Sequence, residues 1–143
     1  MATQNFENHT KFIPGFVFGV LGIFAANLVV SVERLVQHFI VDNAMGALTA
    51  IGLLLCGFYA RNFALTVQDR VIRLEMRLRM ERLLPADLRG RIPEFTVGQL
   101  VALRFAGDGE LPELARKVLG EKIEDRKAIK QMVRDWQADW LRA

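Results

Sequence analysis

Two long runs without a charged side chain dominate the first 60 residues and limit what this chain can fold into. The run at residues 12–32 has 21 residues, and the run at residues 43–60 has 18. A helix of roughly 20 mostly apolar residues crosses the hydrocarbon core of a bilayer, which is about 30 Å thick. Both runs are therefore predicted to span a membrane. The alternative, two buried helices of a soluble protein, is weaker because two such runs so close together would fill a core by themselves.

The first run does not fit a cleavable signal peptide. Lys11 is the only basic residue before it, the run is longer than a usual h-region, and a second apolar run follows at once. The single cysteine, Cys56, lies inside the second run and has no partner for an intramolecular disulfide. Cysteine usage therefore leaves the redox compartment open.

Basic residues are concentrated after the second run. Residues 1–60 carry two basic and three acidic side chains, whereas residues 61–143 carry 17 basic and 13 acidic ones. Segments rich in Lys and Arg stay on the cytoplasmic side of a membrane. The sequence therefore predicts a multi-pass protein of the inner (cytoplasmic) membrane, with its N- and C-termini both in the cytoplasm. The predicted membrane-proximal basic residues are Arg61, Arg70, Arg73 and Arg77.

The helix-breaking residues predict the boundaries of two long helices. Pro14 suits the first turn of the first helix, where its missing N–H costs no hydrogen bond. Asp42-Asn43 predicts the turn, so the second helix is expected to begin near Ala44. Residues 59–84 contain neither Pro nor Gly, and Pro85 follows them. The second helix should therefore continue unbroken to Leu84.

The rest of the chain predicts a small helical domain. Thr96 and Gln99 form a capping box ahead of "VGQLVALRFA". Asp108 is expected to cap the helix in "ELPELARKVL", and Gly120 is expected to follow its end. The last helix is predicted from Lys122 to Trp140. One side of it is apolar: Ile129, Met132, Val133, Trp136 and Trp140.

The predicted fold is therefore all-α, in four segments. They are a polar N-terminal arm (1–12), a transmembrane helical hairpin (13–60), a cytoplasmic extension of the second helix (61–84) and a small helical domain (85–143). No strand pattern and no internal repeat is visible in the sequence.

Small residues recur along one face of each predicted span. Helices in lipid associate through close van der Waals packing, which small side chains permit. These residues are predicted to form a contact between helices, either within one hairpin or between copies of the chain. They are Gly15, Gly19, Gly22, Ala26, Thr49, Gly52, Cys56 and Ala60.

Residues 67–84 carry two apolar stripes on nearly opposite sides of the predicted helix. The first stripe is Val67, Val71, Leu74 and Leu78, and the second is Ile72, Met76 and Leu83. A helix that lies on lipid has one broad apolar face, so two stripes predict protein on both sides. One is expected to pack on the chain's own domain and the other on a second copy, in a coiled-coil-like seam. Glu75 and Arg79, four residues apart, are expected to pair.

Chemistry for catalysis is missing from the predicted domain. Residues 61–143 contain no His, Cys, Ser or Tyr, which removes histidine bases, Ser or Cys nucleophiles and soft metal ligands. His9 and His38 fall on opposite sides of the membrane in the predicted topology. The chain is therefore predicted not to be an enzyme and to hold no cofactor or metal.

Nucleic-acid binding is the main alternative for the domain. "VGQLVALRFAGDGELPELARKVL" could form a helix-turn-helix. Its second helix, however, has basic residues only at Arg116 and Lys117, late in the helix, and acidic Glu110 and Glu113 come first. Acidic residues at that end would repel phosphate, so nucleic acid is an unlikely partner.

Four sequence motifs resemble a family of uncharacterised bacterial proteins. They are "QNFENH" at residues 4–9, "VQDRVIRLEMRLRMERLLP" at 67–85, "TVGQLVALRFA" at 96–106 and "EDRKAIKQMVRDW" at 124–136. The chain resembles, over most of its length, a domain-of-unknown-function family of small two-span membrane proteins. The resemblance implies a bacterial membrane protein and implies no activity or site residues.

The leading functional hypothesis is a non-catalytic integral membrane protein, acting as an oligomeric scaffold or as an accessory subunit of a larger membrane complex. Its expected partners are the lipid bilayer and further copies or subunits. The alternatives are a membrane-tethered regulatory module that binds nucleic acid or a protein, and an oligomeric pore.

Overall fold

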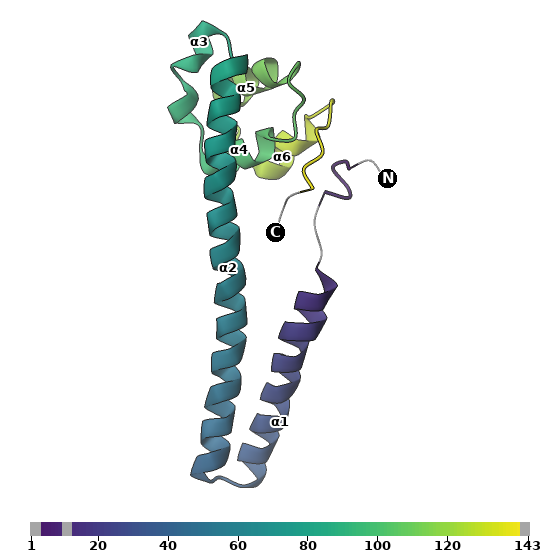
Figure 1. Cartoon of the computed structure of the whole chain (residues 1–143), viewed down its shortest axis with the longest axis vertical. Coiled ribbons are helices and arrows are strands. Elements are labelled where there is room, and N and C mark those ends of the chain that lie inside the picture. Colours follow the sequence, from purple (N-terminus) through teal and green to yellow (C-terminus); the bar gives the residue numbers. More distant parts are fainter. Residues whose placement is uncertain (1–3, 10–12, 141–143) are drawn as a thin grey trace. The chain divides into compact units, whose positions relative to one another are not determined.

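The computed structural model describes residues 4–9 and 13–140. The helices, of which Figure 1 labels α1 to α6, are η1 (Gly15–Gly22), α1 (Ile23–Gln37), α2 (Val41–Leu83), α3 (Ala86–Arg89), η2 (Ile92–Glu94), α4 (Val97–Leu103), α5 (Leu111–Gly120) and α6 (Arg126–Gln131). The predicted all-α class is confirmed, and the β-type pairing among these residues is one isolated bridge between Ala106 and Trp136. The chain divides into two compact units, residues 12–65 and residues 1–11 together with 66–143. Lys11, the basic residue that precedes the first apolar run, lies outside the described residues.

Two helices are long and apolar enough to cross a membrane, as the sequence predicts. η1, a π-helical segment, continues into α1 and gives 23 helical residues whose most apolar window has a mean hydropathy of 2.2. The most apolar window of α2 reaches 1.5. No residue of η1 or α1 is buried, and Phe18 and Ile23 are 69% and 64% exposed. Apolar surface this extensive is unusual for a soluble monomer.

The predicted position of the turn between these helices is wrong by several residues. α1 ends at Gln37 and α2 begins at Val41, so Asp42 and Asn43 lie in the first turn of α2. The side-chain amide of Asn43 donates hydrogen bonds to the carbonyl oxygens of Arg34 (3.1 Å) and His38 (2.8 Å). Both carbonyls also accept a backbone N–H, that of His38 (2.9 Å) and that of Ile40 (3.0 Å), so Asn43 adds a second hydrogen bond to each of them, a role that its turn propensity does not reveal.

The predicted end of α2 is confirmed to within one residue. α2 runs unbroken from Val41 to Leu83, and the Leu84 N–H still donates to the carbonyl of Met80 (2.8 Å). Pro85 then has extended backbone angles. With no Pro or Gly in its last 26 residues, the helix has no reason to stop earlier.

The second unit has a core built from the end of α2 and from α3 to α6. Its largest fully buried side chains are Phe105, Met80, Leu84, Leu88, Leu100, Leu103, Leu111, Ile129 and Val118. The predicted capping box is confirmed at the start of α4. The Thr96 hydroxyl accepts from the Gln99 N–H (3.2 Å), and the Gln99 side-chain oxygen accepts from the Thr96 N–H (2.8 Å).

Two predicted caps of α5 are wrong. Asp108 lies before the helix, whose N-cap is Glu110, and its carboxylate binds the Arg79 guanidinium instead (2.6 Å). Gly120 is the last residue of α5, and the left-handed backbone conformation falls on Lys122, with φ 50°. In both cases a residue with the right propensity lies two residues before the position concerned, Asp108 before Glu110 and Gly120 before Lys122.

The predicted last helix is mostly wrong. α6 covers only Arg126–Gln131, and residues 132–140 are not helical. Ile129 is fully buried and Met132 and Val133 pack on the core, whereas Trp140 is 61% exposed. Asp125 starts the helix by accepting from the N–H groups of residues 127 (3.0 Å) and 128 (3.1 Å).

Tertiary hydrogen bonds hold residues 132–140 in a non-helical form, with a turn at residue 132, bends at residues 134 and 135, and the bridge at Trp136. The Glu110 carboxylate accepts from the N–H groups of Arg134 (3.0 Å) and Asp135 (3.1 Å). The Gln137 N–H donates to the Phe105 carbonyl (2.7 Å), and the Gly107 N–H donates to the Asp135 carbonyl (2.8 Å). These bonds replace the helical ones and override the local periodicity of the sequence.

Candidate functional site

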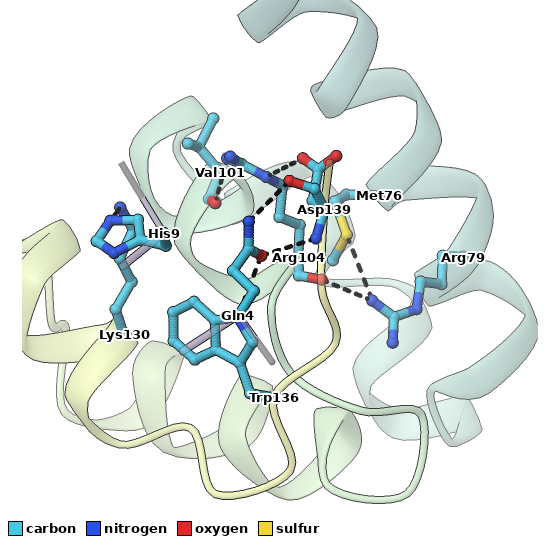
Figure 2. Close-up of polar contacts among 9 residues, drawn as sticks. All are labelled: Gln4, His9, Met76, Arg79, Val101, Arg104, Lys130, Trp136 and Asp139. Atoms are coloured by element: carbon cyan, nitrogen blue, oxygen red, sulfur yellow. Dashed lines mark hydrogen bonds and ion pairs between the residues drawn. The ribbon is translucent and has the colours of Figure 1, made fainter. Parts of the chain in front are cut away.

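The N-terminal arm packs on this non-helical segment through Gln4. Gln4 is 7% exposed although it lies near the end of the chain. Its side-chain nitrogen donates to the Asp139 carbonyl (3.0 Å), and its side-chain oxygen accepts from the Asp139 N–H (2.8 Å) and from Trp136 Nε1 (3.3 Å). Figure 2 shows the amide of Gln4 lying between Trp136 and Asp139. One side chain thus ties residues 4–9 to the far end of the sequence.

His9 makes a second contact between the arm and the domain. Its Nδ1 lies 2.6 Å from the Phe6 carbonyl oxygen, and its Nε2 lies 3.0 Å from the Lys130 ammonium. A carbonyl oxygen only accepts and an ammonium only donates. These two contacts fit the tautomer that carries its proton on Nδ1. Its ring centroid lies 5.6 Å from that of Phe105.

An aromatic pair and a partly buried ion pair lie beneath the arm. Phe105, 1% exposed, stacks on Trp136 with ring centroids 4.5 Å apart and planes 18° apart. Arg104 Nε donates to Asp139 Oδ2 (2.8 Å), and Arg104 Nη1 donates to the Val101 carbonyl (2.8 Å). The guanidinium carbon of Arg104 lies 4.2 Å from the centre of the Phe105 ring. These groups fix the surface that receives Gln4.

A groove of about 550 Å³ runs between residues 68–79 of α2 and the non-helical segment after α6. Val71, Ile72 and Met76 contribute apolar lining, and residues 137–140 form the other side. Arg79 and Arg104 also line it, but both are engaged. Arg79 binds Asp108 (2.6 Å) and the carbonyls of Ala106 (2.6 Å) and Arg104 (3.2 Å). Glu75 therefore lacks the pairing with Arg79 that the sequence predicts.

The two predicted seam stripes of α2 lie in different environments. In the second stripe, Ile72 and Met76 are 5% and 2% exposed, and Leu83 packs partly buried on the same core. The first stripe is exposed, at 59%, 49%, 61% and 53% for Val67, Val71, Leu74 and Leu78. What covers this stripe stays a prediction.

All eight small residues predicted to form a helix contact are exposed in the single chain. The buried small residues of α2 are different ones, Ala47, Ala50 and Gly57. A Cβ added to Gly57 would meet a Leu21 methyl group at 3.1 Å, so Gly57 is where η1 approaches α2. Contact through the stripes from Gly15 to Ala26 and from Thr49 to Ala60, within one hairpin or between copies, stays a prediction.

The predicted membrane-proximal arginines are not alike. Arg70 and Arg73 are exposed, whereas Arg61 and Arg77 are partly buried.

Two carboxyl groups have shifted pKa values, and both lie elsewhere, on the surface. A hydrogen bond from Arg116 lowers the pKa of Asp87, and a hydrogen bond from Arg91 lowers the pKa of Glu94. These are the shifts expected for surface ion pairs.

The arm, the aromatic pair and the Arg104–Asp139 pair escape the sequence argument. Gln4 and Asp139 are 135 residues apart, and no periodicity connects them. The available signal is that three of the resemblance motifs, "QNFENH", "TVGQLVALRFA" and "EDRKAIKQMVRDW", contain Gln4, His9, Arg104, Phe105, Lys130 and Trp136.

Gln4→Ala is expected to lower the free energy of unfolding of this unit by about 1–3 kcal/mol. The substitution removes three hydrogen bonds at a largely buried position, each worth about 1 kcal/mol net. Urea unfolding of the full chain in detergent, followed by circular dichroism, measures the effect. Glu7→Ala is the control, because Glu7 is an exposed residue of the same arm. Equal midpoints for both variants would contradict the docked arm.

A family model described as "Family of unknown function (DUF6526)" matches residues 1–143, the whole chain. Searches of curated proteins and of solved structures found no match.

Proposed function

We propose that this chain, which belongs to the DUF6526 family of unknown function, is a non-catalytic integral membrane protein that crosses the inner membrane twice. The observation that carries the proposal is the pair of long apolar helices whose large side chains face outward. Phe18, Val29 and Phe58 are 69%, 68% and 57% exposed. In water, each Å² of such surface costs about 25 cal/mol, whereas hydrocarbon tails cover it without cost.

The docked arm supports a topology with both ends on one side. Gln4, which precedes the first apolar helix, hydrogen-bonds to Asp139, which follows the second. A chain that crosses twice as a helical hairpin returns to the side on which it began, so these bonds can form in one compartment. The excess of basic residues after residue 60 supports the cytoplasm as that compartment.

A scaffold or accessory subunit fits the second unit better than a catalyst does. Its buried polar groups hold the fold together: Arg104 binds Asp139, Gln99 caps α4, and Gln4 anchors the arm. The most evident surface feature that does not contribute to the core of this unit is apolar: the exposed stripe of α2. Exposed apolar stripes on a helix are typical of surfaces that bind other proteins.

The proposal predicts that the protein stays in the membrane pellet after alkaline carbonate extraction. Its topology is tested with single cysteines in a Cys56→Ala background: Glu7→Cys, Ile40→Cys and Glu121→Cys. A membrane-impermeant maleimide added to spheroplasts is expected to label only position 40. The other two positions should react only after the membrane is opened. Recovery of the protein in the supernatant would overturn the membrane assignment, and labelling of position 121 in sealed cells would overturn the orientation.

A further inference from the structure

We infer that the exposed stripe of α2 binds the same stripe of a second copy of this chain, in a parallel two-stranded coiled coil. The stripe is Val67, Val71, Leu74 and Leu78. The inference rests on the proposed membrane insertion, because two copies inserted the same way direct their α2 helices the same way.

The spacing of the stripe is that of a coiled-coil seam. Its residues follow one another at steps of four, three and four, which corresponds to alternating d and a positions of a heptad. The opposite side of the helix is occupied, because Ile72, Met76 and Met80 are buried in the unit's own core. The exposed stripe is therefore the side of this helix segment that remains for a partner.

Charges beside the stripe favour a second copy in parallel. With Val71 and Leu78 at a and Val67 and Leu74 at d, Arg70 takes a g position and Glu75 the following e position. In a parallel pair, a g residue faces the e residue five positions further along the partner helix, and such pairs set orientation. Arg70 of each copy would then face Glu75 of the other, and both residues are exposed. Because the pair is two-fold symmetric, the attraction between Arg70 and Glu75 occurs twice.

The same charges disfavour an antiparallel pair. An antiparallel pair that aligned the whole stripe would place g residues opposite g residues, so Arg70 would face Arg77 twice. In the parallel pair, the next g–e′ contact is Arg77 with Arg82, which is repulsive. The seam therefore ends near Leu78, seven residues before Pro85. A seam this short is weak alone, but anchoring both copies in one membrane raises their effective concentration.

Cysteine cross-linking in native membranes tests the inference on the full chain. A disulfide needs two Cα atoms within about 7 Å. The two copies of residue 74 come this close only if the stripe is a symmetric contact between two chains. In a Cys56→Ala background, Leu74→Cys is expected to give at least about ten times more oxidised dimer than Arg73→Cys. Arg73 is the matched control because it is exposed on the same helix turn, away from the stripe. Equal cross-linking of both variants, with the protein in the membrane pellet, would overturn the dimer and leave the proposed function standing.

Exchanging the charges of Arg70 and Glu75 tests the parallel register. It also tests whether another protein or a lipid surface, and not a second copy, covers the stripe. Adding Arg70→Glu or Glu75→Arg to the Leu74→Cys protein is expected to reduce the dimer several-fold. The double exchange is expected to restore it, because each pair is then attractive again with its charges reversed. A different protein or a lipid surface on this stripe would not show this reciprocal rescue, and its absence would overturn the parallel register. Loss of the protein from the membrane pellet would instead count against the proposed function.

Discussion

Phe105→Ala is expected to lower the free energy of unfolding of the second unit by about 3–5 kcal/mol, the range for a large buried aromatic side chain. Phe105 is 1% exposed and lies between three groups that hold the C-terminal segment and the arm in place. Trp136 stacks on its ring at 4.5 Å, Arg104 lies 4.2 Å from the ring centre, and His9 meets it edge-on at 5.6 Å. Alanine would leave a cavity at the point where all three meet.

The expected result is a lower urea midpoint for the full chain in detergent, measured by circular dichroism at a helical wavelength. Phe105→Leu should cost less, about 1–2 kcal/mol, because leucine keeps most of the buried surface and loses only the ring contacts. Trp140→Ala is the matched control, since Trp140 is a large aromatic residue of the same unit that is 61% exposed. A loss as large for Trp140→Ala as for Phe105→Ala would mean that the stacked pair is not the structural centre of this unit.

The parts of the fold that the sequence predicts well depend on local signals. The absence of charge over residues 12–32 and 43–60 marks the two apolar helices. The absence of Pro and Gly before Pro85 predicts the long α2, and Thr96 with Gln99 predicts the start of α4. Each of these outcomes is decided by residues that are close together in the chain, so a reader of the sequence sees all the groups involved.

The parts that fail depend on groups far apart in the chain. Residues 132–140 have the apolar spacing of a helix, but Glu110 and Phe105 bind their backbone in a non-helical form. Gly107 permits this arrangement, because a Cβ there would collide with the Asp135 carboxylate. Nothing within residues 126–140 indicates those partners. Local periodicity therefore predicts a longer helix than tertiary hydrogen bonding allows.

The choice of contact faces between the two apolar helices also depends on more than local signals. Small side chains at helical spacing show that a close approach is possible, and several faces of the two apolar helices offer them. The structure uses Ala47, Ala50 and Gly57 within one chain and leaves the predicted stripes exposed. Choosing among such faces depends on the bulky partners, here Leu21 and Phe24 opposite Gly57, which a count of small residues does not include.

Asp139→Ala is expected to destabilise the second unit by about 2–3 kcal/mol, because it removes the carboxylate beside a buried guanidinium. Arg104 is 7% exposed at its side chain, and its Nε donates to Asp139 Oδ2 over 2.8 Å. Removing one partner of a fully buried ion pair costs about 3–5 kcal/mol, and the 27% exposure of the Asp139 side chain reduces this figure because water screens the remaining charge.

The chain contains its own control for this effect. Arg79 and Asp108 form the same type of pair at 2.6 Å, but the Asp108 side chain is 67% exposed. Asp108→Ala is therefore expected to cost at most about 1 kcal/mol, as for ion pairs at a surface. Comparing the urea midpoints of the two variants shows whether burial or the N–O distance determines how much each ion pair contributes to stability. If Asp108→Ala proved as costly as Asp139→Ala, the shorter distance and not the burial would set the strength of these pairs. Adding Arg104→Met to Asp139→Ala should recover part of the loss, because the methionine leaves no buried charge to satisfy.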